Sequence, residues 1–308
     1  MISKSILEIH KKKFYFTLNI SGDVMKKTAL LIFLFSIILS AQIKIPYERY
    51  VLPNGLNVIL HEDHTTPTVS VNTWYHVGSS YEKPGKTGFA HLFEHLMFEG
   101  SKHVPEGDFD KLLEAVGGEN NGSTTEDRTN YYEDVPSNAL ELALYLDSDR
   151  MGFLLDAMTP EKVDGQREVV KNERRQSYEN RPYGLAWETI YKNLYPAGHP
   201  YSWPVIGSME DLNSASYEDV VEFYKTYYVP NNASLVIAGD INPKETIKLV
   251  EKWYGNIPAG KPVPPQNPAA ANLLEEKIVV LEDKVQLPRI YMTWITPPKF
   301  APGDAEMD

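Results

Sequence analysis

The chain has 308 residues, of which 42% are hydrophobic and 11% aromatic, so it can bury a sizeable core in one or two domains. Its formal net charge of −12 at pH 7 leaves no basic surface for a phosphate backbone, which argues against nucleic acid as a partner. It has no cysteine, which excludes disulfides, thiol nucleophiles and thiolate ligands. Any metal must therefore be bound by His, Asp or Glu.

Residues 1–41 are predicted to lie outside the fold, as an upstream extension followed by a signal peptide. Met25, Lys26 and Lys27 form a basic start, residues 29–39 are apolar, and small residues suited to cleavage follow. The apolar run is shorter than the roughly 20 residues that span a bilayer, so we favour a cleaved signal over a membrane anchor. Both Met1 and Met25 are candidate starts. The mature protein is predicted to be exported, periplasmic or extracellular, in a bacterium, with no transmembrane anchor.

From residue 42 to 256 the pattern is that of one compact domain of strands and helices. Strands are predicted where β-branched and aromatic residues gather, at 57–60, 68–75, 122–132 and 233–240. Helices are predicted where helix formers or capped amphipathic runs occur, at 89–98, 108–116, 137–151, 160–177, 217–227 and 243–253.

A proline-rich linker is predicted at 257–275, because several prolines in this span exclude a helix or a central strand. Beyond it, residues 277–282 and 290–295 are predicted strands. We interpret 276–308 as the truncated start of a second, homologous domain.

A candidate metal site lies on the predicted helix 89–98, which carries the pattern H-x-x-E-H. Residues four apart on a helix lie about 40° apart and about 6 Å along the axis, so the imidazoles of His91 and His95 can reach one ion. Glu94 lies beside His91, where a general base could act on water. Two imidazoles leave a catalytic zinc site incomplete, so a third ligand must come from elsewhere. The five-residue pattern alone is weak evidence.

The sequence around these residues, 88–100, resembles the active-site helix of the pitrilysin and insulinase (M16) family, which includes exported bacterial members and the mitochondrial processing peptidases. The family's later segment E-R-x-V-V-x-x-E matches residues 166–173 here, which implies Glu173 as the third ligand. Glu168 is the competing candidate, and helix geometry places it about 140° away from Glu173. The first glutamate of the segment is replaced by Gln166, which puts an auxiliary acid role in doubt.

The resemblance implies an α+β fold with a mixed, mainly antiparallel sheet flanked by helices, as in mitochondrial processing peptidase. It implies a Zn2+-dependent endopeptidase in which His91, His95 and Glu173 bind the metal and Glu94 activates water. Peptides or unstructured polypeptides are the expected substrates, bound at a strand containing Asn121, Gly122 and Thr124. A second homologous domain or a partner subunit is expected to complete the active site. The alternatives are a non-catalytic subunit for assembly or substrate capture, and a metal-binding module without hydrolytic activity.

Overall fold

The structure is a computed structural model that describes residues 44–307. The chain divides into two units, Met1–Ile45 and Pro46–Asp308, and the fold below is that of the second unit. The predicted signal peptide lies outside the described residues. Within 44–307, no helix is long and apolar enough to cross a membrane.

A six-stranded sheet forms the centre of the domain, in the order β1-β2-β6-β3-β5-β4. Only β2 and β6 pair in parallel, and every other neighbouring pair is antiparallel. The strands are β1 (Glu48–Val51), β2 (Asn57–Glu62), β3 (Thr68–Tyr75), β4 (Glu119–Thr124), β5 (Thr129–Pro136) and β6 (Ala233–Gly239). The predicted α+β fold with a mixed, mainly antiparallel sheet is confirmed.

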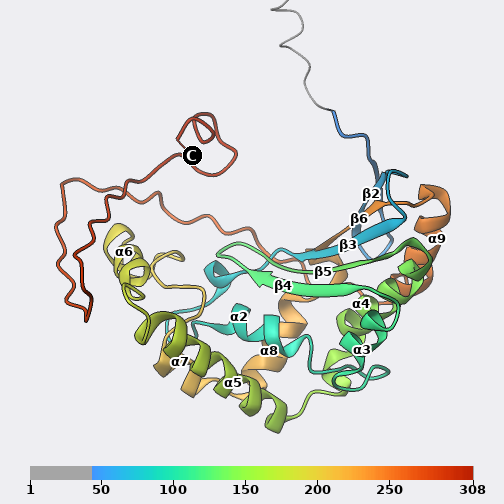
Figure 1. Ribbon diagram of the computed structural model, residues 1–308, viewed down its shortest axis with the longest axis horizontal. Helices are drawn as coiled ribbons and strands as arrows, with labels where there is room; N and C mark the ends of the chain where they lie inside the picture. Colours follow the sequence, from blue (N-terminus) through green and yellow to red (C-terminus); the bar gives the residue numbers. More distant parts are fainter. Residues whose placement is uncertain (1–43, 308) are drawn as a thin grey trace, which may run out of the picture. The chain divides into compact units, whose positions relative to one another are not determined.

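The helices cover one face of this sheet (Figure 1). The reason is visible in β3, where the side chains alternate between buried and more exposed along Thr68–Tyr75, so one face is apolar and the other polar. The helices are α2 (Phe89–Leu96), α3 (Asp108–Glu114), α4 (Leu140–Phe153), α5 (Pro160–Arg174), α6 (Ala186–Leu194), α7 (Met209–Ser214), α8 (Tyr217–Tyr227) and α9 (Pro243–Tyr254). Together with the sheet they enclose one apolar core.

The predicted single strand 122–132 is wrong, because the chain reverses there. β4 and β5 form a hairpin, and the amide of Thr125 donates to the carbonyl of Arg128 at 2.8 Å to close the turn. The two turn residues are Glu126 and Asp127, with no glycine, so the usual hairpin signal is missing. The hairpin makes β4 an edge strand.

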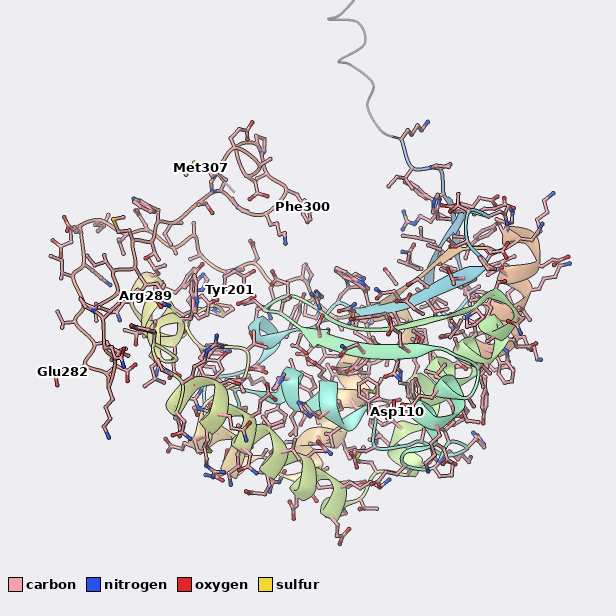
Figure 2. The ribbon with its side chains drawn as sticks, in the orientation of Figure 1. Asp110, Tyr201, Glu282, Arg289, Phe300 and Met307 are labelled. Carbon is pink, nitrogen blue, oxygen red and sulfur yellow. The ribbon has the colours of Figure 1, made fainter. Side chains whose placement is uncertain are left out.

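The predicted strands 277–282 and 290–295 are also wrong, since the structure assigns no strand there. The stretch runs as irregular chain through Glu282, Arg289 and Phe300 (Figure 2). Its apolar side chains are exposed, including Val280 and Ile290 at 85% each. A strand is stable only when a neighbour pairs with it and covers one face, and these segments have neither among the described residues.

Among the strands and α-helices of the described residues, β1, α6 and α7 were not predicted from the sequence. Two predicted helices also differ at their ends. The helix predicted at 137–151 begins with a 3-10 turn, Ser137–Ala139, and the one predicted at 160–177 ends in a π turn, Arg175–Glu179. The π turn directly follows the helix that carries Glu173.

Candidate metal centre

Helix α2 presents its polar residues outward because its apolar side is anchored in the core. Phe89, Leu92, Phe93 and Leu96 are buried. Phe93 stacks on Phe223 of α8 and on Tyr228, with ring centroids 5.1 and 4.9 Å apart. This leaves His91, Glu94 and His95 on the half-buried side of the helix.

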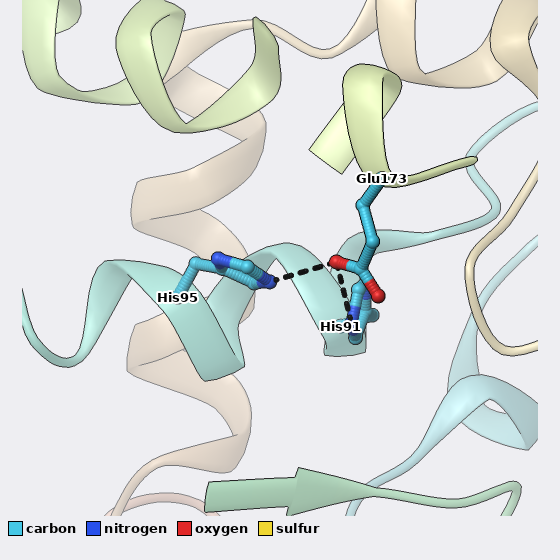
Figure 3. Close-up of side chains that lie close together, drawn as sticks. All are labelled: His91, His95 and Glu173. Atoms are coloured by element: carbon cyan, nitrogen blue, oxygen red, sulfur yellow. Dashed lines mark ion pairs between the residues drawn. The ribbon is translucent and has the colours of Figure 1, made fainter. Parts of the chain in front are cut away.

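Helix α5 brings the third residue from a distant part of the sequence. It begins at Pro160 after the N-cap Thr159, whose hydroxyl accepts from the amide of Lys162. Val163 and Val170 are buried, while most of the helix is polar. Its last turn packs against α2 and places Glu173 beside the two histidines (Figure 3).

The three side chains converge on one point. One nitrogen of each imidazole and one oxygen of Glu173 all lie within 4.8 Å of one another. The oxygen Oε2 of Glu173 is 3.7 Å from Nε2 of His91 and 3.4 Å from Nε2 of His95. Four-coordinate zinc with bonds of about 2.0–2.1 Å separates neighbouring ligand atoms by about 3.4 Å. The donor set and its spacing therefore fit zinc.

The electrostatics of the group also suit a metal. Burial lowers the pKa of His91, against the opposing effect of the Glu173 and Glu94 carboxylates, so the neutral imidazole is favoured. The pKa of Glu173 is lowered, chiefly by its hydrogen bond with His95. A metal requires this combination of a neutral imidazole and an ionised carboxylate.

Glu94 is held beside the group by the edge strand. The hydroxyl of Thr124 in β4 donates to Oε2 of Glu94 at 2.6 Å. A Cβ atom on Gly122 would lie 3.1 Å from Cγ of Glu94. The end of β4 therefore packs directly on the residue between the two histidines.

The competing ligand Glu168 does not join the group. Its carboxylate accepts from Nζ of Lys171 at 2.5 Å, and its side chain is 58% exposed. Gln166 also points elsewhere, because its amide donates to the carboxylate of Glu99 at 2.6 Å. Both α5 residues thus have other partners, and Glu173 is the acidic residue of this helix that the structure brings to the histidines.

The three residues predicted to bind substrate occupy β4 in different ways. Thr124 bonds to Glu94, and Gly122 leaves beside Glu94 the space that a Cβ atom would crowd. Asn121 is exposed, and its side-chain oxygen accepts from the amide of Gly122 at 2.8 Å. Sequence reasoning missed the contact between Thr124 and Glu94, which no spacing rule could have indicated for residues 30 positions apart.

Two histidines and a glutamate that converge beside a further glutamate are the arrangement of an H-x-x-E-H metallopeptidase. Comparisons with known proteins agree with this class of site. The sequence profile of insulinase, peptidase family M16, matches residues 57–200, and that of the M16 inactive domain matches residues 214–306. The chain belongs to the M16 peptidase family.

Several of the similar proteins are bacterial proteases. The chain is 34% identical over 212 residues to the zinc protease PqqE of Helicobacter pylori, covering 68% of this chain and 47% of that protein. The crystal structure of a protease from Helicobacter pylori superimposes with a TM-score of 0.69 at 32% identity, covering 73% of this chain and 54% of that one. The first half of the periplasmic protease PqqL from Escherichia coli shares the fold, with a TM-score of 0.64 at 24% identity over 72% and 48% of the two chains. The chain spans about half the length of the curated relatives it matches.

Proposed function

We propose that this chain is the metal-binding half of a zinc-dependent endopeptidase. The observation that carries the proposal is the convergence of His91, His95 and Glu173 from two helices, with Glu94 beside them. The names of the relatives support it, because several are zinc proteases. The alternative of a non-catalytic subunit is not favoured, since all four residues are present.

In this proposal Nε2 of His91, Nε2 of His95 and a carboxylate oxygen of Glu173 hold the metal. Bound zinc supplies Lewis acidity toward water and toward the scissile carbonyl. Glu94 accepts a proton from water and passes it to the leaving amine, as a general base and then a general acid. Thr124 orients Glu94 through its hydrogen bond, which leaves the second carboxylate oxygen available for the proton.

The edge strand β4 supplies the binding surface for the substrate in this proposal. An edge strand has main-chain groups without a neighbouring strand, so an extended peptide can add to it by main-chain hydrogen bonds. This mode selects extended chains, which supports peptides or unstructured polypeptides as substrates. Asn121 is exposed on this strand, and its side chain caps the amide of Gly122. Binding of a peptide at Gly122 would displace that side chain.

A second half is proposed to complete the active site. Glu173 is 41% exposed, so the metal group is open on one side. The chain spans about half of its relatives, and the similar PqqL structure is described as the first half of that protein. A homologous domain or a partner subunit would cover the open side and exclude water.

The test separates metal binding from chemistry. The chain should bind about one zinc ion, and His91→Ala or Glu173→Ala should lose it, whereas Glu168→Gln should not. Glu94→Gln should keep zinc, yet lower turnover of an unstructured peptide by the complete two-half enzyme by about 10² to 10⁴. Loss of zinc from Glu168→Gln but not from Glu173→Ala would refute the ligand assignment. Turnover above about a tenth in Glu94→Gln would refute its role as the base.

We also propose that the protein is exported. The support is the signal-like segment before residue 42 and the similarity to PqqL of Escherichia coli, which is a periplasmic protease. Protein isolated from the native host should begin near Ala41 or Gln42, as N-terminal sequencing would show. A soluble cytoplasmic product that retains Met25 would contradict export.

A further inference from the structure

The first turn of α2, which carries His91, lacks an ordinary N-cap. Its N-cap residue is Gly88, with φ 90°, and no side chain of the cap position bonds to the helix. The first amides of a helix have no partner inside it and must be satisfied from elsewhere. His91 is the third residue of the helix, so the position of this ligand depends on what holds that turn.

A buried carboxylate from outside the helix takes this role. One oxygen of Glu82 accepts from the amide of Gly88 at 2.9 Å, and the other accepts from the amide of Ala90 at 2.8 Å. Glu82 is 8% exposed. Its own segment is fixed to the turn after β4, since the amides of Ser79 and Ser80 donate to the carbonyls of Thr125 and Glu126.

The end of α5, which carries Glu173, is held by a second buried side chain, that of Arg174. Arg174 follows Glu173 directly, and its guanidinium is buried. It donates to the carbonyl of Gly207 at 2.7 Å and to the carboxylate of Glu188 at 2.7 Å. The last turn of α5 is therefore tied to the backbone of Gly207.

The backbone partners of Glu82 and Arg174 lie against each other, because Gly207 contacts Gly88. A Cβ atom on Gly207 would be 2.4 Å from Cα of Gly88, and one on Gly88 would be 2.7 Å from the carbonyl oxygen of Ile206. Both glycines have positive φ. The backbones can approach this closely only because neither residue has a side chain. This contact places the start of α2 beside the backbone to which Arg174 ties the end of α5.

We propose that Glu82 and Arg174 are positioning residues of the metal centre, which hold α2 and α5 in register through the contact between Gly88 and Gly207. Glu82 fixes the turn that bears His91, and Arg174 fixes the turn that bears Glu173. Neither residue touches the metal group. The inference rests on the proposed zinc site.

The experiment measures zinc affinity by competition with a chromophoric chelator, and the visible absorption of the Co2+-saturated chain. Glu82→Gln and Arg174→Gln remove the anchors, and Glu161→Gln and Arg175→Gln are matched controls. Glu161 is an exposed acid in the first turn of α5, and within 44–307 the side chain of Arg175 donates a hydrogen bond to Asn172 alone. Loss of groups that orient metal ligands typically costs about 10–100-fold in affinity. We expect that weakening in both test variants, with an altered Co2+ spectrum at saturation, and neither effect in the controls.

The Co2+ spectrum separates positioning from stability, because a variant that is merely less stable gives the unchanged spectrum once it is folded and saturated. Folded test variants with the unchanged spectrum and with zinc affinity within about twofold of the parent chain, far below the expected loss, would overturn the inference. If the Gln variants do not fold, Glu82→Asp, which keeps the carboxyl group, and Arg174→Lys, which keeps the positive charge, are judged by the same criteria. Failure of the parent chain to bind zinc would instead overturn the proposed zinc site.

Discussion

Replacement of Arg150 by Met should destabilise the domain strongly, because it leaves a buried carboxylate without a partner. Arg150 is 1% exposed, and its guanidinium lies 2.5 Å from Glu133 and 2.6 Å from Asp147, both of which are fully buried. Asp147 would keep the hydroxyl donors Thr73 and Tyr254. Glu133 would keep no side-chain donor, since its other oxygen already lacks a partner in the structure.

Removal of one partner from a buried ion pair typically costs about 3–5 kcal/mol. At about 2–4 °C per kcal/mol for a domain of this size, the midpoint of thermal unfolding should fall by roughly 6–20 °C. The guanidinium also lies 4.6 Å from the ring centres of Phe109 and Tyr131, and the loss of these contacts adds to the cost. Circular dichroism of the metal-free chain during heating and in urea would measure the change.

Two further variants make this experiment specific. Burial raises the pKa of Glu133 to about 8, and without Arg150 this carboxyl must be either ionised and unpaired or protonated at neutral pH. Glu133→Gln added to Arg150→Met removes that cost and should recover part of the loss. Lys252→Met breaks an exposed, solvent-screened ion pair with Glu141 and should change the unfolding midpoint little. The reasoning would be refuted if Arg150→Met cost no more than that control, or if Glu133→Gln gave no recovery.

Two smaller predictions concern the edge strand and one surface histidine. Gly122→Ala should raise stability by up to about 1 kcal/mol through the entropy of the unfolded chain, provided that Glu94 and the buried ring of Tyr131, which the new Cβ would approach to 3.1 and 3.3 Å, shift slightly; zinc binding should be unchanged. A fall in the unfolding midpoint would show that Glu94 or Tyr131 cannot yield. The side-chain hydrogen bonds to Asp240 and Glu62 raise the pKa of His64, so NMR titration should give a value above 6.5 that falls in Asp240→Asn. The stabilisation from the contact of His64 with Asp240 should be complete below the unfolded-state pKa of His64 and should disappear as the pH rises through its folded-state pKa. An unchanged His64 pKa in Asp240→Asn would contradict this prediction.

Helix α2 could be predicted from the sequence because the pattern that indicates it lies within the helix itself. Helical periodicity alone places His91 and His95 on one side, and the structure has α2 at Phe89–Leu96. Glu173 came from the family resemblance, since no local rule connects it with residues almost 80 positions earlier. The anchors Glu82 and Arg174 could not be predicted, because only the folded chain brings their partners near: the amides of Gly88 and Ala90 for Glu82, and the carbonyl of Gly207 and the carboxylate of Glu188 for Arg174.

The buried ion pairs of Arg150 with Glu133 and Asp147 could not be predicted from the sequence for a related reason. The run Asp147-Ser148-Asp149-Arg150 has the composition of a solvated helix face, yet all four residues are buried. Helix α4 packs against the sheet and against α3 and α9, so little of it faces solvent. Charged residues buried in such a helix need partners within the fold, and the sequence does not show which residues these are.

Metal binding and peptide hydrolysis should be separable in this protein, because they depend on different amounts of the fold. All three proposed ligands and their anchors lie within 82–174, so the chain contains what zinc binding requires. Catalysis additionally requires that water be excluded from the charges that develop during the reaction. The side chains of His95 and Glu173 are 25% and 41% exposed, so this chain alone does not exclude it. We therefore expect the chain alone to bind zinc but to hydrolyse peptides slowly. Addition of the proposed second half should raise turnover without changing zinc affinity, and a large gain in zinc affinity would show that this half supplies a ligand.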